Sequence, residues 1–308
     1  MFRRHKLHWA LALMLSLILL FAGCTPKPTT PQGVTDQLGR AVKLQNFPQR
    51  IVSLAPSNTE ILFALGLGDK VVGVTPYDNF PPEAKQKESV GGYSTPDIEK
   101  VVALKPDLIV ATSTHEKKVI PELERRNIPI IALSPRSVPE ILEGITLLGK
   151  VTGADSEARK LVNSMQGRIN KVSKLTSQIA PAERTRVFYV LWHDPLRTAG
   201  KDTFHDTLIN LAGGVNIFGD VDRYGLVNLE TVLDRNPQVI LADTGHGSGG
   251  DAPFRWAMDE SRLKGTDALK KSLVFKIDAD IVNRPGPRIV DAMEAMLQLI
   301  HPDLYKKL

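Results

Sequence analysis

A stretch of 18 residues occurs twice in this chain, each time without a gap. It reads DIEKVVALKPDLIVATST at 97–114 and NLETVLDRNPQVILADTG at 228–245. In both copies an acidic residue stands near the start, a proline follows, and an apolar run comes next. Proline disfavours helix at the residue before it, so each copy predicts a short helix, a turn and a strand buried on both faces. The duplication therefore predicts two lobes of one architecture, with a ligand cleft between them.

Predicted strands and helices alternate over the rest of the chain. A strand at 50–54 leads into a helix whose start carries Ser57 and Glu60 at the spacing of a capping box. This order predicts an α/β fold class, with two similar lobes whose sheets are mainly parallel. The further strands are predicted at 71–74, 108–111, 130–133, 186–191, 239–242 and 274–277.

One longer helix is predicted between the lobes, from near Asp155 towards Leu175. Apolar residues recur three or four positions apart along this segment and form one stripe. About 21 helical residues would reach about 32 Å, which is enough to join both lobes. An ordinary surface helix of one lobe has the same spacing, so the pattern leaves that alternative open.

The first residues predict export. Arg3, Arg4 and Lys6 precede an apolar run at 9–22 that is too short and wrongly flanked for a membrane-spanning helix. Cys24, the only cysteine of the chain, follows after a single glycine. This arrangement resembles a bacterial lipoprotein box, which implies a lipid on Cys24. The alternative is an ordinary cleaved signal in which Cys24 has no role.

These patterns divide the chain into five predicted parts. A polar, proline-rich segment after Cys24 cannot bury a core and is expected to act as a tether. About 285 residues remain after the signal, enough for two lobes that each hold a hydrophobic core. The predicted parts are a signal peptide at 1–23, a lipid-anchored linker at 24–34, an N-terminal lobe at 35–153, an inter-lobe helix at 154–180 and a C-terminal lobe at 181–308.

Composition and motifs argue against several function classes. The formal charge is +5, but three positive charges lie in the first 23 residues, which hold no acid, so the mature chain carries only +2. Nucleic acid is therefore not an expected partner. The mature chain has no HExxH helix, no GxSxG turn and no paired histidines at ligand spacing. Neither an enzyme, nor a resident cofactor, nor a site for a bare metal ion is expected.

Several segments together resemble a known family, the helical-backbone (class III) solute-binding proteins of ABC importers. The likeness covers nearly the whole mature chain and is strongest to the cobalamin-binding proteins, whose relatives carry ferric siderophores or haem. It implies a lipid-anchored monomer, in the periplasm or on the outer face of the cytoplasmic membrane. Such a protein hands cobalamin or a related corrinoid to an ABC permease and its ATPase; a ferric siderophore or haem is the alternative cargo. The segments that carry the likeness are SLAPSNTE, VTPYDNFPPEA, DIEKVVALKPDLIV, AGKDTFHDTLINLAGGVNIF, LETVLDRNPQVIL and NRPGPRIV.

The resemblance assigns a role to the two acids at the start of the repeated unit. In the cobalamin binders each lobe presents one exposed glutamate to arginine pockets on the permease, and those positions are similar to Glu99 and Glu230 here. One carboxylate on each lobe would give two charge-assisted contacts with a two-fold symmetric partner. The alternative is that both acids only favour the start of a helix through its dipole.

The same resemblance implies a ligand site built from aromatic and basic side chains. Tyr77, Tyr93 and Tyr224 resemble positions that place rings against the bound corrin, and Arg284 resembles a basic residue in the same wall. Flat rings gain dispersion and apolar burial from such side chains. Trp192 would add another ring.

This chain also departs from the family pattern. It has Thr112 where the cobalamin binders can carry a tryptophan, and Arg197 where they can carry a phenylalanine. With Arg284, Arg197 would make part of the site cationic, which suits a carboxylate-bearing haem or an anionic ferric chelate at least as well as a neutral corrinoid. His193 beside Trp192 could reach a cargo metal, although a lone loop histidine is more often only solvated.

Overall fold

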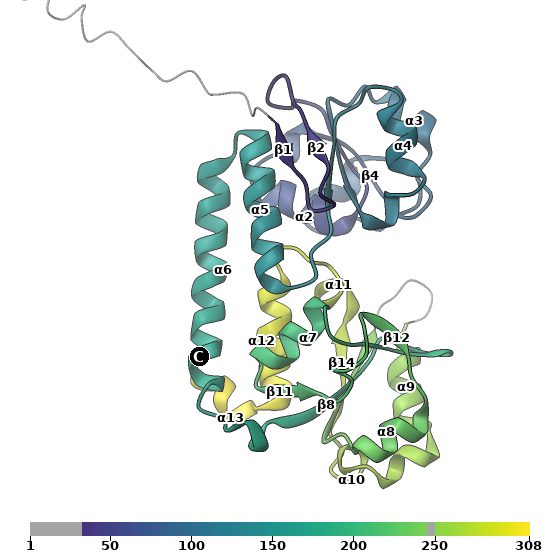
Figure 1. Ribbon diagram of the computed structural model, residues 1–308, viewed down its shortest axis with the longest axis vertical. Coiled ribbons are helices and arrows are strands. Elements are labelled where there is room, and N and C mark those ends of the chain that lie inside the picture. Colours follow the sequence, from purple (N-terminus) through teal and green to yellow (C-terminus); the bar gives the residue numbers. More distant parts are fainter. Residues whose placement is uncertain (1–32, 245–249) are drawn as a thin grey trace, which may run out of the picture.

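Each lobe of the protein is built around its own parallel sheet, in agreement with the predicted fold class (Figure 1). The computed structural model describes residues 33–244 and 250–308. The N-lobe sheet has the strand order β5-β4-β3-β6-β7. Its strands are β3 (Ile51–Ser53), β4 (Val71–Val74), β5 (Glu88–Ser89), β6 (Leu108–Thr112) and β7 (Ile130–Leu133).

The C-lobe sheet has the order β11-β8-β13-β14, and all of its pairings are parallel. Two small antiparallel sheets accompany the parallel ones, β1-β2 and β12-β10-β9, and the sequence patterns did not predict them. The strands are β8 (Thr185–Val190), β11 (Gly214–Asn216), β13 (Val239–Thr244) and β14 (Val274–Asp278), with β1 (Val34–Thr35), β2 (Ala41–Val42), β9 (Trp192–His193), β10 (Leu196–Ala199) and β12 (Tyr224–Leu226).

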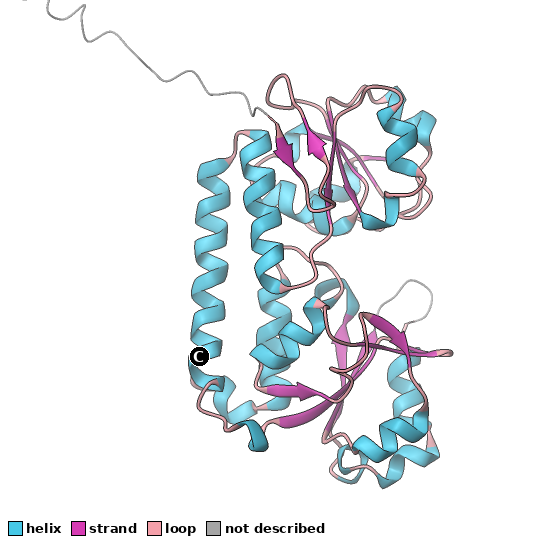
Figure 2. Ribbon diagram, viewed as in Figure 1, coloured by secondary structure: helices cyan, strands magenta, loops and turns pink. Residues whose placement is uncertain are grey.

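Helices cover both parallel sheets (Figure 2). Those of the N-lobe are α2 (Pro56–Ala64), α3 (Ile98–Ala103), α4 (Val119–Glu124) and α5 (Val138–Thr152), and α6 (Asp155–Thr176) follows α5. Those of the C-lobe are α7 (Phe204–Leu211), α8 (Leu229–Arg235), α9 (Ala252–Asp259), α10 (Asp267–Lys270), α11 (Ala279–Val282), α12 (Ile289–Ile300) and α13 (Pro302–Tyr305). Within the described residues, no helix has the length and apolar character needed to cross a membrane.

The repeated unit folds in the same way in both lobes. Asp97 caps α3 by accepting a hydrogen bond from the Lys100 amide, and Asn228 caps α8 in the same way from the Thr231 amide. The turn then leads into β6 or β13, each an internal, buried strand of its sheet. Two copies of one pattern thus give two equivalent helix-to-strand units, as the repeat predicts.

Helix α6 runs alongside both lobes (Figure 1). It packs against α5 of the N-lobe and against α7 and α12 of the C-lobe. Met165, Ile169 and Val172 are buried on its inner stripe. On the same helix, Arg168 forms a bidentate ion pair with Glu294 of α12, at 2.7 and 2.8 Å.

The main hydrophobic cluster belongs to both lobes. Side chains alternate along each central strand, so one face of each sheet packs into this shared cluster and the other into a cluster of its own lobe. On β6, Leu108 packs in the shared cluster and Ile109 in the N-lobe cluster. On β13, Leu241 packs in the shared cluster and Ile240 in the C-lobe cluster. The expectation that each lobe holds its own core is therefore only half right.

The predicted capping box is wrong. Helix α2 begins at Pro56, its N-cap is Ala55, and no side chain caps it. Proline fits the first helical position because its fixed backbone angle is already helical and its missing N–H needs no partner. The helix therefore starts two residues earlier than the box requires. Ser57 lies inside the first turn, and Glu60 is free to make the contacts described below.

Candidate functional site

The predicted ligand residues lie beyond the carboxyl ends of the parallel strands. In the N-lobe, Tyr77 follows β4 and Tyr93 follows β5; in the C-lobe, Trp192 follows β8 and Arg284 lies beyond β14. Ligands of open α/β sheets bind at this edge. The topology thus brings predicted residues from both lobes to equivalent sheet edges.

The antiparallel sheet β12-β10-β9 places three predicted residues of the C-lobe on one face. Arg197 is directly opposite both Trp192 and Leu226, and Ala199 is opposite Tyr224. Opposite residues share a face, as do residues two positions apart along a strand. Trp192, Arg197, Tyr224 and Leu226 therefore form one surface, which we call the C-lobe wall. Leu226 is 62% exposed and was missed, because a three-residue strand gives no periodic signal.

The N-lobe contributes three exposed aromatic residues, Tyr77, Phe80 and Tyr93. Together with Tyr224 and Leu226 they are five of the eight large hydrophobic side chains that are exposed in the described part of the chain. Monomeric proteins rarely leave such side chains gathered in one place unless that place binds something. The sequence did not single out Phe80, because a loop phenylalanine carries no pattern that separates a packed ring from an exposed one.

Tyr93 is held in place by a buried histidine. The Thr112 amide donates to Nδ1 of His115 at 3.0 Å, so the proton of the neutral ring lies on Nε2, which donates to the Tyr93 carbonyl at 2.6 Å. The Tyr93 hydroxyl also bonds to the side chains of Thr112 and Thr114, at 3.2 and 2.9 Å. Thr112 thus supports the neighbouring tyrosine ring.

Acid should destabilise this support. Burial lowers the pKa of His115 below its ordinary 6.5, against the effect of its two backbone hydrogen bonds. The contribution of His115 to the free energy of unfolding is therefore complete above pH 6.5 and is lost as the pH falls through the lowered value. His115→Gln keeps one donor and one acceptor but cannot titrate. Urea unfolding at about pH 7.5 and about pH 5.5 should show a larger loss for the unmodified protein than for the variant. Equal losses would contradict this role.

Tyr224 rests on a buried polar network of the C-lobe. Its hydroxyl lies 3.2 Å from Nδ1 of His205, whose Nε2 lies 2.6 Å from the side-chain oxygen of Asn283. The side-chain amide of Asn283 donates to Asp243 at 2.7 Å, and Asp243 also accepts from the hydroxyl of Tyr189. The ring of Tyr224 is thus anchored at its hydroxyl end while part of its face stays exposed.

The two tyrosines of the opposite lobes lie close enough to interact. Enclosure of its hydroxyl raises the pKa of Tyr224 above the ordinary value of 10, and the negative charge of Asp243 and the nearby Tyr93 act in the same direction. Tyr93 belongs to the N-lobe and Tyr224 to the C-lobe wall. The two side chains, one from each lobe, are therefore within electrostatic range of each other.

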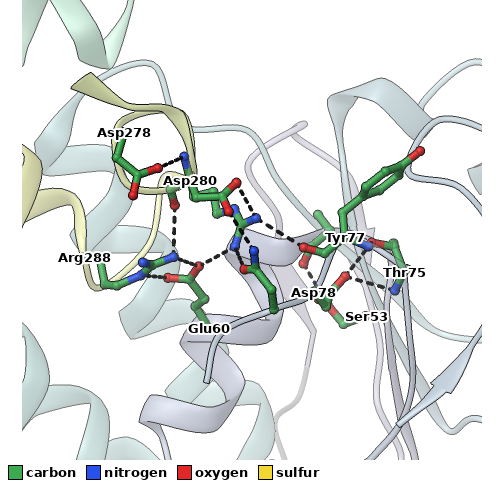
Figure 3. Close-up of polar contacts among 11 residues, drawn as sticks. Ser53, Glu60, Thr75, Tyr77, Asp78, Asp278, Asp280 and Arg288 are labelled. Carbon is green, nitrogen blue, oxygen red and sulfur yellow. Dashed lines mark hydrogen bonds and ion pairs between the residues drawn. The ribbon is translucent and has the colours of Figure 1, made fainter. Parts of the chain in front are cut away.

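Arg284 lies between the lobes, with its guanidinium bound to protein. It is 9% exposed and donates to Glu60, Asn79, Asp280 and the Tyr77 carbonyl, at 2.6 to 3.2 Å. Figure 3 shows this cluster, with the Tyr77 ring pointing away from it. Arg197, by contrast, is exposed on the C-lobe wall. Of the two predicted cationic residues, Arg197 is the one whose side chain is open to a ligand.

A separate hollow lies on the α5–α6 side of the protein. It is an open groove of about 510 Å³, lined mainly by aliphatic parts of side chains. None of the predicted ligand residues contributes to it, and it holds no aromatic ring. We favour the surface beyond the carboxyl ends of the two parallel sheets as the site, because exposed rings of both lobes and the exposed Arg197 lie there. The groove residues are Pro139, Leu142, Glu143, Thr146, Leu147, Lys150, Val162 and Gln166.

The two predicted docking acids lie in the first turns of α3 and α8 and are exposed. Figure 1 shows these helices at the outer ends of the two lobes, both on the side away from α6. Glu99 forms an exposed ion pair with Arg126 at 2.8 Å. Cys24, the signal peptide and most of the linker lie outside the described residues. Among those described, no three His, Cys, Asp or Glu residues gather as metal ligands.

The sequence profile of the family described as periplasmic binding protein matches residues 51–281. The chain belongs to this family. Like YvrC of Bacillus subtilis, an ABC transporter substrate-binding lipoprotein that is 33% identical over 97% of this chain and 98% of its own length, it is a solute-binding protein. This confirms the expectation that the chain is not an enzyme.

Two solved structures are similar to this periplasmic binding protein. The periplasmic vitamin B12 binding protein BtuF of Vibrio cholerae has a TM-score of 0.70 and 31% identity, covering 85% of this chain and 99% of its own. A possible iron-binding protein of Staphylococcus epidermidis has a TM-score of 0.71 and 27% identity, covering 83% and 100%. Both comparisons support the two-lobed fold with parallel sheets.

Proposed function

We propose that this periplasmic binding protein captures cobalamin or a related corrinoid between its lobes and delivers it to an ABC permease and its ATPase. The observation that carries the proposal is the gathering of exposed rings on both lobes, with Tyr77, Phe80 and Tyr93 on one side and the C-lobe wall on the other. A large, rigid, flat ligand gains most from such surfaces, because it buries apolar area without losing its own flexibility.

The similarity to the vitamin B12 binding protein of Vibrio cholerae supports this cargo. Tyrosine hydroxyls at the ring edges can also bond to the amides at the rim of a corrin. Each tyrosine is hydrogen-bonded to a buried side chain. The carbonyl of Tyr77 bonds to Arg284, the carbonyl of Tyr93 to His115, and the hydroxyl of Tyr224 to His205. A site whose rings are already fixed binds with a smaller loss of conformational entropy.

A second cargo class is favoured by Arg197. Arg197 is directly opposite Trp192 and Leu226 in the C-lobe wall, and its positive charge has no partner on a neutral corrinoid ring. An anionic ferric siderophore, or haem with its carboxylates, would place a negative charge there. We keep this class as the alternative.

The proposal extends to the anchor and the permease. Glu99 and Glu230 would dock the two lobes on the permease, and a lipid on Cys24 would hold the protein, as a monomer, at the outer face of the cytoplasmic membrane or in the periplasm. The separation of the two helices, one on each lobe, supports docking on a two-fold symmetric partner.

Visible absorption after gel filtration tests the cargo. The protein is incubated separately with cyanocobalamin, haemin and a ferric siderophore, and each mixture is separated from free ligand. We expect cobalamin to elute with the protein in equimolar amount. Retention of haemin or of the ferric chelate, with no retention of cobalamin, would replace the first cargo by the second.

A further inference from the structure

The two lobes meet at a buried cluster of charges between α2 and the segment that joins α11 to α12. Glu60 of α2 accepts two hydrogen bonds from Arg288, at 2.6 and 2.8 Å, and one from Arg284 at 3.2 Å. The Glu60 side chain is 1% exposed. Figure 3 shows Glu60 beside Arg288 of the C-lobe, and the acid belongs to the N-lobe. The carboxylate therefore links the two lobes from a site closed to water.

The same two arginines hold a loop of the N-lobe. Arg284 donates to the carbonyl of Tyr77 at 3.2 Å and to the side chain of Asn79 at 2.6 Å. The Arg288 guanidinium lies 4.2 Å from the centre of the Phe80 ring, within range of a cation–π contact. Tyr77 itself is 55% exposed. The loop at 75–80, which carries two of the exposed rings, is thus fixed by side chains of the other lobe.

The loop's own hydrogen bonds are all made by Thr75, whose hydroxyl accepts from the Tyr77 amide at 3.3 Å. Asp78 accepts from the Thr75 amide at 3.0 Å, and the Asp78 amide donates to the Thr75 carbonyl at 3.2 Å. The contacts from the C-lobe act further along, at Tyr77, Asn79 and Phe80. Asn79 adds a bond of 2.7 Å to Asp280 of α11. The orientation of the exposed rings therefore depends on how the two lobes sit against each other.

Glu60 decides whether this arrangement holds. Two guanidinium groups repel when they are buried together, and an unpaired buried charge is strongly unfavourable. Glu60 faces both arginines, while Asp280 reaches Arg284 at 2.7 Å from the more exposed side. If Glu60 loses its charge, the arginines lose their common partner and are expected to move towards water. The carbonyl of Tyr77 and the ring of Phe80 would then lose the groups that hold them.

We propose that Glu60, Arg284 and Arg288 form a clamp between the lobes that positions Tyr77 and Phe80 for the ligand. Arg284 thereby acts through the backbone of Tyr77 and is a positioning residue, whereas Arg197 is the cation that faces the ligand. The proposal deepens the function proposed above and rests on it for the ligand alone. The clamp itself is a property of the ligand-free protein.

Hydrogen exchange of the ligand-free protein tests the clamp. Glu60→Gln keeps the shape of the side chain and removes its charge. The matched control is Glu294→Gln, because Glu294 accepts the same bidentate pair from Arg168 on the side of α6. We expect the amides of residues 77 and 78 to exchange at least tenfold faster in Glu60→Gln and at the original rate in Glu294→Gln. Unchanged exchange at these amides in Glu60→Gln would overturn the clamp. Faster amide exchange throughout both lobes would mean that Glu60 has only a general structural role, and it would overturn the clamp as well.

Titration with cyanocobalamin then tests the positioning role. We expect Glu60→Gln to bind cyanocobalamin at least tenfold more weakly than the unmodified protein. When Tyr77→Ala and Phe80→Ala are present in both proteins, the fold-loss of affinity caused by Glu60→Gln should be at least threefold smaller. The same loss with and without the two rings would overturn the positioning role. If the unmodified protein does not bind cobalamin, the proposed cargo fails while the exchange result still decides the clamp. If Glu60→Gln does not fold, Asn79→Ala takes its place with the same expected acceleration, because it removes the two lobe-to-lobe hydrogen bonds of Asn79 and leaves Glu60 to pair with both arginines. An unchanged rate would overturn the clamp.

Discussion

Replacing Glu99 and Glu230 together with alanine should nearly abolish cargo uptake while the affinity for the cargo stays unchanged. Both side chains are exposed, and their helices, α3 and α8, lie at the outer ends of the two lobes (Figure 1). A charge-assisted hydrogen bond contributes about 1.5 to 3 kcal/mol. Loss of two such contacts should therefore weaken docking on the permease by about a hundredfold or more.

Uptake of radiolabelled cobalamin by cells at limiting receptor concentration measures docking, and titration of the purified protein measures binding. Asp234→Ala is the matched control, since Asp234 is an exposed acid on the same helix as Glu230. The control should behave like the unmodified protein in both assays. Normal uptake by the double variant would mean that the two acids serve only their own helices. Loss of binding would show that they support the fold instead.

Tyr93→Ala should weaken cobalamin binding by about 1 to 3 kcal/mol, or roughly 5- to 150-fold. The ring is fixed by the hydroxyl bonds to Thr112 and Thr114 and by the carbonyl bond to His115, so little entropy is lost when a ligand packs on it. Its removal takes away buried apolar area.

Isothermal titration with cyanocobalamin gives the affinity, and Tyr93→Phe is the control. Phenylalanine keeps the ring and loses only the hydroxyl, so it should retain most of the binding free energy. An unchanged affinity in Tyr93→Ala would remove Tyr93 from the site. A loss of the same size in both variants would mean that the hydroxyl, rather than the ring, makes the contribution.

The sequence predicted the parallel framework well, because that framework follows from local signals. Buried strands read as apolar runs and helices as apolar stripes, and the repeat linked one unit in each lobe. The capping box failed for a local reason as well: Pro56 is compatible with the first helical position and moves the helix start. Glu60 was consequently taken for a cap instead of a partner of the C-lobe.

The candidate site was predicted less completely, because its shape depends on contacts between distant segments. The register of three very short strands places Arg197 beside Leu226, and no periodicity reveals this pairing. Arg284 was predicted in the wall of the ligand site, but three of its four partners, Glu60, Asn79 and Tyr77, lie more than 200 positions away in the sequence. Residue type alone cannot distinguish an arginine that meets a ligand from one that is occupied within the protein.

The shared hydrophobic cluster has a consequence for how the chain denatures. Because one face of each sheet packs into a cluster common to both halves, separating them would expose apolar surface on both. Neither half is then expected to persist as a stable fragment after cleavage near residue 154. Heating should accordingly give one calorimetric transition rather than two, with the midpoint set by the weaker half.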